Sequence, residues 1–130
     1  MEKGTYLLIE DQDVDIMIVE KMMDRIRPGL KAIVVRNGKS ALDKLKEILS
    51  GNKEDFPGFI FLDLIMPLFD GFQFLDAYYR EIYPIAPDLP VVVLSSSVHE
   101  KDKKKCLGYP FVKEYLLKPF NTNAFEELGV

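Results

Sequence analysis

The stretch FIFLD at positions 59–63 places a carboxylate, Asp63, directly after an apolar run. A second apolar run, YLLI at positions 6–9, is followed in the same way by Glu10 and Asp11. Both runs are continuous rather than alternating in polarity, which predicts strands buried on both faces of a parallel sheet. If these strands are neighbours, three carboxylates meet and disturb one another's titration. Folding does not require such a cluster, so it predicts a site for a hard divalent cation.

Apolar runs alternate with amphipathic stretches along the whole chain. This alternation predicts five strands and five helices, in the order βαβαβαβαβα. The predicted strands are residues 5–9, 31–35, 58–62, 91–94 and 114–117. The predicted helices are residues 14–26 with Asp13 as N-cap, 41–49, 71–82, 98–107, and a short one after Asn121. Repeated strand–helix units favour a flavodoxin-like, doubly wound α/β fold, a five-stranded parallel sheet of order 2-1-3-4-5 with helices on both faces.

The predicted strand order also locates a site. The first and third strands are adjacent, and ligands of such sheets bind beyond the carboxyl ends of the strands where the order reverses. Glu10, Asp11 and Asp63 lie at this point. The strand order and the clustering of carboxylates therefore predict the same location for the site, and they do so independently. Ser95 follows the fourth strand and Lys118 follows the fifth, which adds a hydroxyl and an ammonium group to the same edge.

Composition excludes several classes of protein. The chain has 130 residues, which predicts a single domain over residues 1–130. Its net charge of -4 argues against nucleic acid as a partner, and no apolar run approaches the ~20 residues that span a bilayer. The first residues lack a signal-peptide layout, and Cys106 is the only cysteine. We therefore expect a cytoplasmic protein with no membrane partner.

Taken together, these motifs resemble the receiver domain of two-component response regulators, the CheY-like family. Each motif alone is weak, but their order and their positions at strand ends make the combination specific. The resemblance covers essentially the whole chain, which also resembles the solitary receivers that carry no output domain. The matching pieces are Glu10-Asp11, Asp63 followed by Met66-Pro67, Asp70-Gly71, Ser95-Ser96 and Lys118-Pro119-Phe120.

The resemblance implies a phosphorylation site and a metal site. Asp63 is the implied nucleophile and phosphorylation site, where a phosphoryl group forms an acyl phosphate. The implied cofactor is Mg²⁺, for which Mn²⁺ can substitute. The implied metal ligands are Glu10, Asp11, Asp63 and the backbone carbonyl of Ile65.

The resemblance also implies roles around the phosphoryl group. Lys118 supplies positive charge to the transferring oxygens and Ser95 donates a hydrogen bond, so both join Asp63 as catalytic residues. Lys118 and Pro119 are the implied cis peptide. Ser95 and Tyr115 are the implied switch residues. Ser95 moves toward the phosphoryl group and Tyr115 turns inward. These movements change the surface formed by the fourth helix, the fifth strand and the fifth helix.

Three residues depart from the commoner family pattern. Glu10 replaces an Asp, which lengthens one arm of the metal site, and Ser95 replaces a Thr, which retains the hydroxyl. Ile65 is bulky and apolar at a position that controls how water reaches the acyl phosphate, which predicts slow self-dephosphorylation.

The predicted function is two-component phosphorelay signalling rather than enzymatic catalysis. The expected partners are a histidine kinase or histidine phosphotransfer protein and a downstream protein target. Two alternatives remain open: a pseudo-receiver that only binds partners, and an aspartyl-phosphate hydrolase. The hydrolases place their nucleophile after the first strand, whereas Asp63 follows the third. A flavin-binding flavodoxin shares the topology, but Glu10 and Asp11 would repel the phosphate of FMN.

Overall fold

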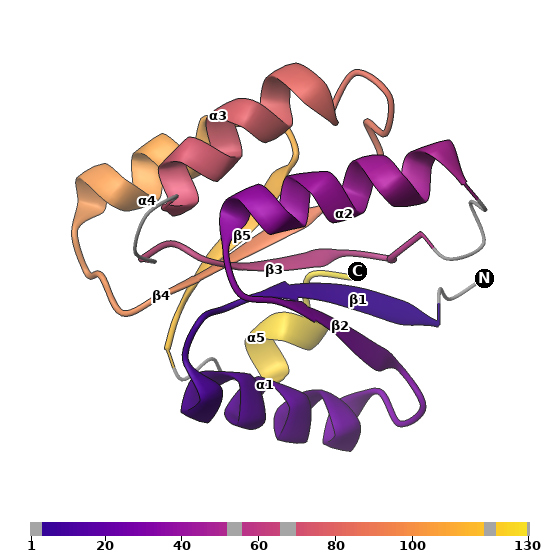
Figure 1. Ribbon diagram of the computed structural model, residues 1–130. Coiled ribbons are helices and arrows are strands. Elements are labelled where there is room, and N and C mark those ends of the chain that lie inside the picture. The colour runs from indigo at the N-terminus through magenta and orange to yellow at the C-terminus, as the bar shows by residue number, and fades with distance from the viewer. Residues whose placement is uncertain (1–3, 52–55, 66–69, 119–121, 130) are drawn as a thin grey trace.

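The computed structural model describes residues 4–51, 56–65, 70–118 and 122–129. In this part of the chain, five parallel strands form one sheet of order β2-β1-β3-β4-β5 (Figure 1). The strands are β1 (Thr5–Ile9), β2 (Lys31–Val35), β3 (Ile60–Asp63), β4 (Val91–Ser95) and β5 (Val112–Leu117). The predicted doubly wound parallel sheet is therefore confirmed.

Helices cover both faces of this sheet. Figure 1 shows α1 and α5 on one face and α2, α3 and α4 on the other. Their bounds are α1 (Asp13–Ile26), α2 (Gly38–Ser50), α3 (Gly71–Glu81), α4 (Glu100–Leu107) and α5 (Thr122–Glu126). None of the described helices is both long enough and apolar enough to cross a membrane.

The continuous apolar strands supply two cores because successive side chains point to opposite faces of the sheet. In β1, Leu7 and Ile9 pack in the cluster beneath α2 and α3, whereas Tyr6 and Leu8 pack in the cluster beneath α1 and α5. All four side chains are at most 1% exposed. Burial of a large apolar side chain contributes about 1.5–3 kcal/mol, so both faces of this strand stabilise the fold.

The start of α1 differs from the prediction. Asp13 is the first helical residue rather than the N-cap, which is Gln12, and the Gln12 side chain makes no capping hydrogen bond. The carboxylate of Glu10 instead accepts hydrogen bonds from the backbone N–H groups of Asp11 and Gln12. Asp13 pairs with Arg36 and lies in the first turn, where the helix dipole favours an acidic residue.

Other bounds differ by two or three residues. The third strand begins at Ile60 rather than 58, and the fifth begins at Val112 rather than 114. The helix predicted from 98 begins at Glu100, because the Ser97 hydroxyl accepts a hydrogen bond from the N–H of His99 and holds a turn there. All residues of α4 are described, and Cys106 alone is buried, which agrees with the weak packing expected from its polar sequence. Asn121, the predicted cap of α5, lies outside the described residues.

The start of α3 makes a tight contact with Leu64, the residue that follows β3. Asp70 caps α3 in a capping box with Gln73, in which each side chain accepts a hydrogen bond from the other residue's backbone N–H. The N–H of Gly71 donates to the carbonyl of Leu64 at 3.0 Å. A Cβ at Gly71 would lie 2.6 Å from the Leu64 Cα and 2.7 Å from its carbonyl oxygen. Glycine is thus required here by close backbone approach, next to Asp63.

We predict that Gly71→Ala destabilises the protein by about 1–3 kcal/mol or more, because the new methyl group meets backbone that cannot move aside cheaply. Urea unfolding measures the effect. Gly4→Ala is the matched control, since a Cβ at Gly4 would meet nothing within 4 Å. Equal stability of the two variants would contradict the close approach at Gly71.

Candidate functional site

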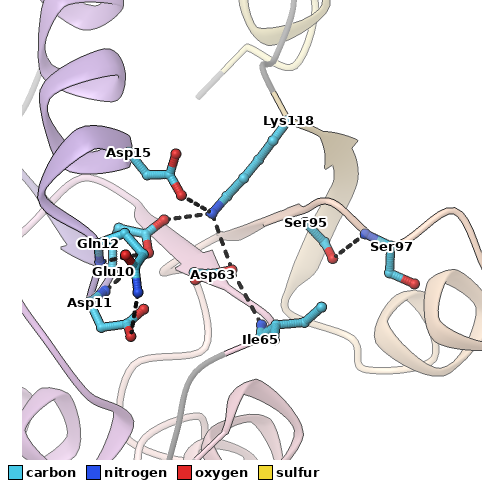
Figure 2. Close-up of polar contacts among 9 residues, drawn as sticks. All are labelled: Glu10, Asp11, Gln12, Asp15, Asp63, Ile65, Ser95, Ser97 and Lys118. Atoms are coloured by element: carbon cyan, nitrogen blue, oxygen red, sulfur yellow. Dashed lines mark hydrogen bonds and ion pairs between the residues drawn. The ribbon is translucent and has the colours of Figure 1, made fainter.

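Three carboxylates lie together at the carboxyl ends of β1 and β3 (Figure 2). The two strands are neighbours, and Ile9 pairs with Leu62 directly before the acidic residues begin. One carboxylate oxygen from each of Glu10, Asp11 and Asp63 lies within 4.8 Å of the other two. The parallel sheet therefore brings together acids that are more than 50 positions apart in the sequence.

Glu10 is the most deeply buried acid of this cluster, with 1% of its surface exposed. Its Oε2 accepts hydrogen bonds from the backbone N–H groups of Asp11 and Gln12 at 3.0 and 3.2 Å. Its Oε1 pairs with the Lys118 ammonium at 2.7 Å. Burial raises the pKa of Glu10 to about 7, Asp63 adds to the rise, and Lys118 opposes it. Glu10 is thus held in place by its partners, but its charge is costly to keep.

Asp11 is bonded differently. Its Oδ2 accepts a hydrogen bond from the Gln12 side chain at 3.3 Å. Its Oδ1 is buried and has no hydrogen-bond partner among the described residues. An unsatisfied buried polar atom costs about 1–3 kcal/mol, so a metal ion is a fitting partner for this oxygen. Three clustered carboxylates form the hard-oxygen donor set that Mg²⁺ and Mn²⁺ take in proteins, and the residues present therefore fit a divalent metal.

The Lys118 ammonium contacts three acids. Its Nζ lies 2.7 Å from Glu10, 3.0 Å from Asp15 and 3.4 Å from Asp63, and 19% of its side chain is exposed. Burial on its own would lower the pKa of Lys118, but the hydrogen bonds to Glu10 and Asp15 and the charge of Asp63 raise it overall. Lys118 therefore remains a cation at neutral pH.

Asp15 is a residue of the site that the sequence did not reveal. It lies in the first turn of α1, four residues after Asp11. Its place beside the acidic pair was visible in the sequence, but its contact with Lys118 was not, because the two residues are 103 positions apart.

Ser95 ends β4, one residue after Leu94, which pairs with Asp63 of β3, and it is fully buried. Its Oγ accepts a hydrogen bond from the backbone N–H of Ser97 at 3.0 Å. The Ser97 hydroxyl bonds to Asp102 of α4 at 2.7 Å, and the Tyr115 hydroxyl donates to the Ser97 carbonyl at 2.9 Å. Tyr115 is 6% exposed, so its ring already faces inward. A hydrogen-bonded chain thus connects the site edge with α4 and β5.

The remaining predicted pieces are partly outside the described residues. Ile65 is exposed, and its N–H donates to Asp63 Oδ1 at 3.2 Å. Pro119 of the predicted cis peptide lies outside the described part, as do Met66, Pro67 and Phe120.

Comparison with known proteins matches residues 6–128 to the response regulator receiver domain. The probable methanogenesis regulatory protein FilR2 of Methanothrix harundinacea is 32% identical over 122 residues, which are 94% of this chain and 74% of FilR2. In two longer histidine kinases, the matching segment spans only 7% and 6% of the relative.

Solved structures give the same result. A two-component response regulator from Cytophaga hutchinsonii superposes with a TM-score of 0.87 at 25% identity, over 99% of this chain and 96% of that one. The Mn²⁺-bound response regulator Rcp1, a Synechocystis protein, superposes with a TM-score of 0.73 at 27% identity, over 96% and 88% of the two chains.

The chain belongs to the response regulator receiver family. Its function is therefore two-component, phosphorelay signal transduction, and the family's role is regulatory. Rcp1 holds Mn²⁺ in its solved structure, and the three clustered carboxylates of this chain form a donor set that fits a divalent metal.

We predict that millimolar Mg²⁺ raises the melting temperature, because it relieves repulsion among the three acids and binds only the folded site. At ten times its dissociation constant, Mg²⁺ adds about 1.4 kcal/mol of stability, or about 3–8 °C. Calorimetry with and without Mg²⁺ measures the shift.

Asp11→Asn should lose most of this shift while being at least as stable as the wild type without metal, since one of three repelling charges is gone. Asp24→Asn, an exposed aspartate at the far end of α1, is the matched control and should keep the full shift. A wild-type melting curve that Mg²⁺ leaves unchanged would argue against the metal site.

Proposed function

We propose that residues 1–130 act as one receiver domain, which accepts a phosphoryl group on Asp63. The donor is the phosphohistidine of a histidine kinase or of a histidine phosphotransfer protein. The observation that carries the proposal is the position of Asp63. It ends β3 at the edge of the sheet, is 5% exposed, and lies between the acidic pair and the Lys118 ammonium.

In the proposed reaction, a carboxylate oxygen of Asp63 attacks the phosphorus of the donor. The new O–P bond forms as the P–N bond to the donor imidazole breaks, and the imidazole leaves as a neutral ring because its other nitrogen takes up a proton from solvent. Lys118 offsets the negative charge on the transferring oxygens, and its distance of 3.4 Å from Asp63 supports this role. The Ile65 N–H steadies the carboxylate through its bond to Oδ1.

The proposed metal is Mg²⁺, with Mn²⁺ as a substitute. Asp11, Asp63 and Glu10 would hold it with the carbonyl of Ile65, and the unpartnered Oδ1 of Asp11 supports this assignment. When bound, the ion offsets the repulsion between an anionic nucleophile and an anionic phosphoryl group.

Ser95 and Tyr115 are the proposed switch. If the Ser95 hydroxyl turns toward a phosphoryl group on Asp63, it gives up its bond with the N–H of Ser97. Ser97 is also held by Tyr115 and Asp102, so its movement reaches α4 and β5. Such a change biases two arrangements of the face that a downstream protein binds.

The protein is proposed to act in the cytoplasm through protein contacts alone, without nucleic acid or membrane as a partner. It is proposed to have no enzymatic activity beyond its own phosphorylation and dephosphorylation. The retained acids, hydroxyl and lysine favour this assignment over a pseudo-receiver that only binds partners.

We predict that Asp63→Asn abolishes labelling from radioactive acetyl phosphate in the presence of Mg²⁺ and leaves the fold intact, because the amide is not a nucleophile. Gel autoradiography measures the label, and circular dichroism checks the fold. Asp24→Asn is the control and should label fully.

The same assay separates the alternatives. A wild-type protein that takes no label would support the pseudo-receiver, and turnover of simple phosphate esters would support the hydrolase. Labelling that persists in Asp63→Asn would reject Asp63 as the acceptor.

We predict that Ile65→Asn shortens the lifetime of the acyl phosphate by about an order of magnitude, because the amide can position an attacking water that an isoleucine cannot. The Ile65 side chain is 61% exposed, so the substitution creates no cavity in the core. Release of phosphate from labelled protein measures the lifetime. Equal lifetimes for Ile65→Asn and wild type would show that this side chain does not control access of water.

A further inference from the structure

The Lys118 ammonium has as many acid partners as it has N–H donors. An ammonium group donates three hydrogen bonds. Glu10, Asp15 and Asp63 each offer one carboxylate oxygen to it, at 2.7, 3.0 and 3.4 Å (Figure 2). The longest and therefore weakest of the three contacts is the one with Asp63, the residue that is proposed to carry the phosphoryl group.

The two shorter contacts come from different elements. Glu10 follows β1 and is held by backbone N–H groups, whereas Asp15 belongs to the first turn of α1. A flexible four-carbon side chain reaches many positions, and one anchor alone leaves it free to rotate about that anchor. Two anchors from separate elements restrict the ammonium and direct its third N–H toward Asp63.

We propose that Asp15 is a positioning residue for phosphoryl transfer, which acts by holding the Lys118 ammonium toward Asp63. This role rests on the proposed function of Asp63 and Lys118. Asp15 itself is not assigned to the metal or to the phosphoryl group. Its side chain is 34% exposed, so it reaches the site from the rim.

A neighbouring aspartate separates this role from a general effect of charge. Asp13 lies in the same turn of α1 and carries the same charge, but it pairs with Arg36 at 2.6 Å and is 79% exposed. Loss of either aspartate removes one negative charge near an anionic phosphodonor, which by itself would speed the reaction. Loss of Asp15 alone frees Lys118.

The first test is the rate of labelling of Asp63 from acetyl phosphate, measured against donor concentration. Asp15→Ala should lower the maximal rate of labelling about fivefold, which is the size of effect expected when one partly exposed, charge-assisted hydrogen bond is lost. Asp13→Ala should not lower it. Asp15→Asn keeps an oxygen that accepts the same N–H and should recover most of the rate.

The second test follows the ammonium directly. In ¹⁵N-labelled protein without phosphodonor, the NMR order parameter of the Lys118 ammonium should fall in Asp15→Ala and be largely restored in Asp15→Asn. Lys46, which pairs with Glu81, is the internal reference and should not change. The backbone spectrum checks that α1 remains folded.

The outcomes separate this proposal from the proposed function. If Asp15→Ala and Asp13→Ala label alike and the Lys118 order parameter is unchanged, Asp15 is not a positioning residue. A larger rate in Asp15→Ala than in Asp13→Ala would show that Asp15 only repels the donor, and would also overturn the proposal. A wild-type protein that takes no label rejects the proposed function, and the ammonium measurement still decides whether Asp15 holds Lys118.

Discussion

The site depends on one constraint, the adjacency of two parallel strands whose chains both continue into acids. Parallel pairing of β1 with β3 sends Glu10, Asp11 and Asp63 to the same edge of the sheet. Carboxylates this close repel one another strongly when they are buried, so the arrangement needs positive charge. The described structure supplies one cation from within, Lys118, and leaves one oxygen of Asp11 without a partner. A divalent ion held by these carboxylates would offset the repulsion that remains.

Much of this arrangement was predictable from the sequence, for identifiable reasons. Continuous apolar runs specify buried strands, and an acid at the end of such a run fixes where the strand stops, as Asp63 does. Strand order followed from the repeated strand–helix pattern. What the sequence did not reveal depends on side-chain geometry between distant elements. The pairing of Asp15 with Lys118 joins residues that are 103 positions apart, and neither residue type indicates which residue its partner is.

The wrong helix starts have a common cause. Propensity placed Asp13 as a cap, but the carboxylate of Glu10 binds the backbone N–H groups of Asp11 and Gln12, and α1 begins directly after them. Similarly, Ser97 holds a turn before α4 through its bonds with His99 and Asp102. In both cases a side chain that accepts hydrogen bonds from nearby backbone N–H groups shapes the turn between the strand and the helix.

The position of Lys118 has a mechanical consequence. It directly follows β5, an edge strand that is hydrogen-bonded to a single neighbour, β4. Its ammonium is nevertheless ion-paired with Glu10, which follows β1, and with Asp15 of α1. Two strands, β3 and β4, lie between β5 and β1 in the sheet. These ion pairs connect the carboxyl end of the edge strand β5 to β1 and α1, so fraying of that end would have to break them. A force that a bound protein exerts on β5 would consequently be transmitted to Glu10 and to the start of α1.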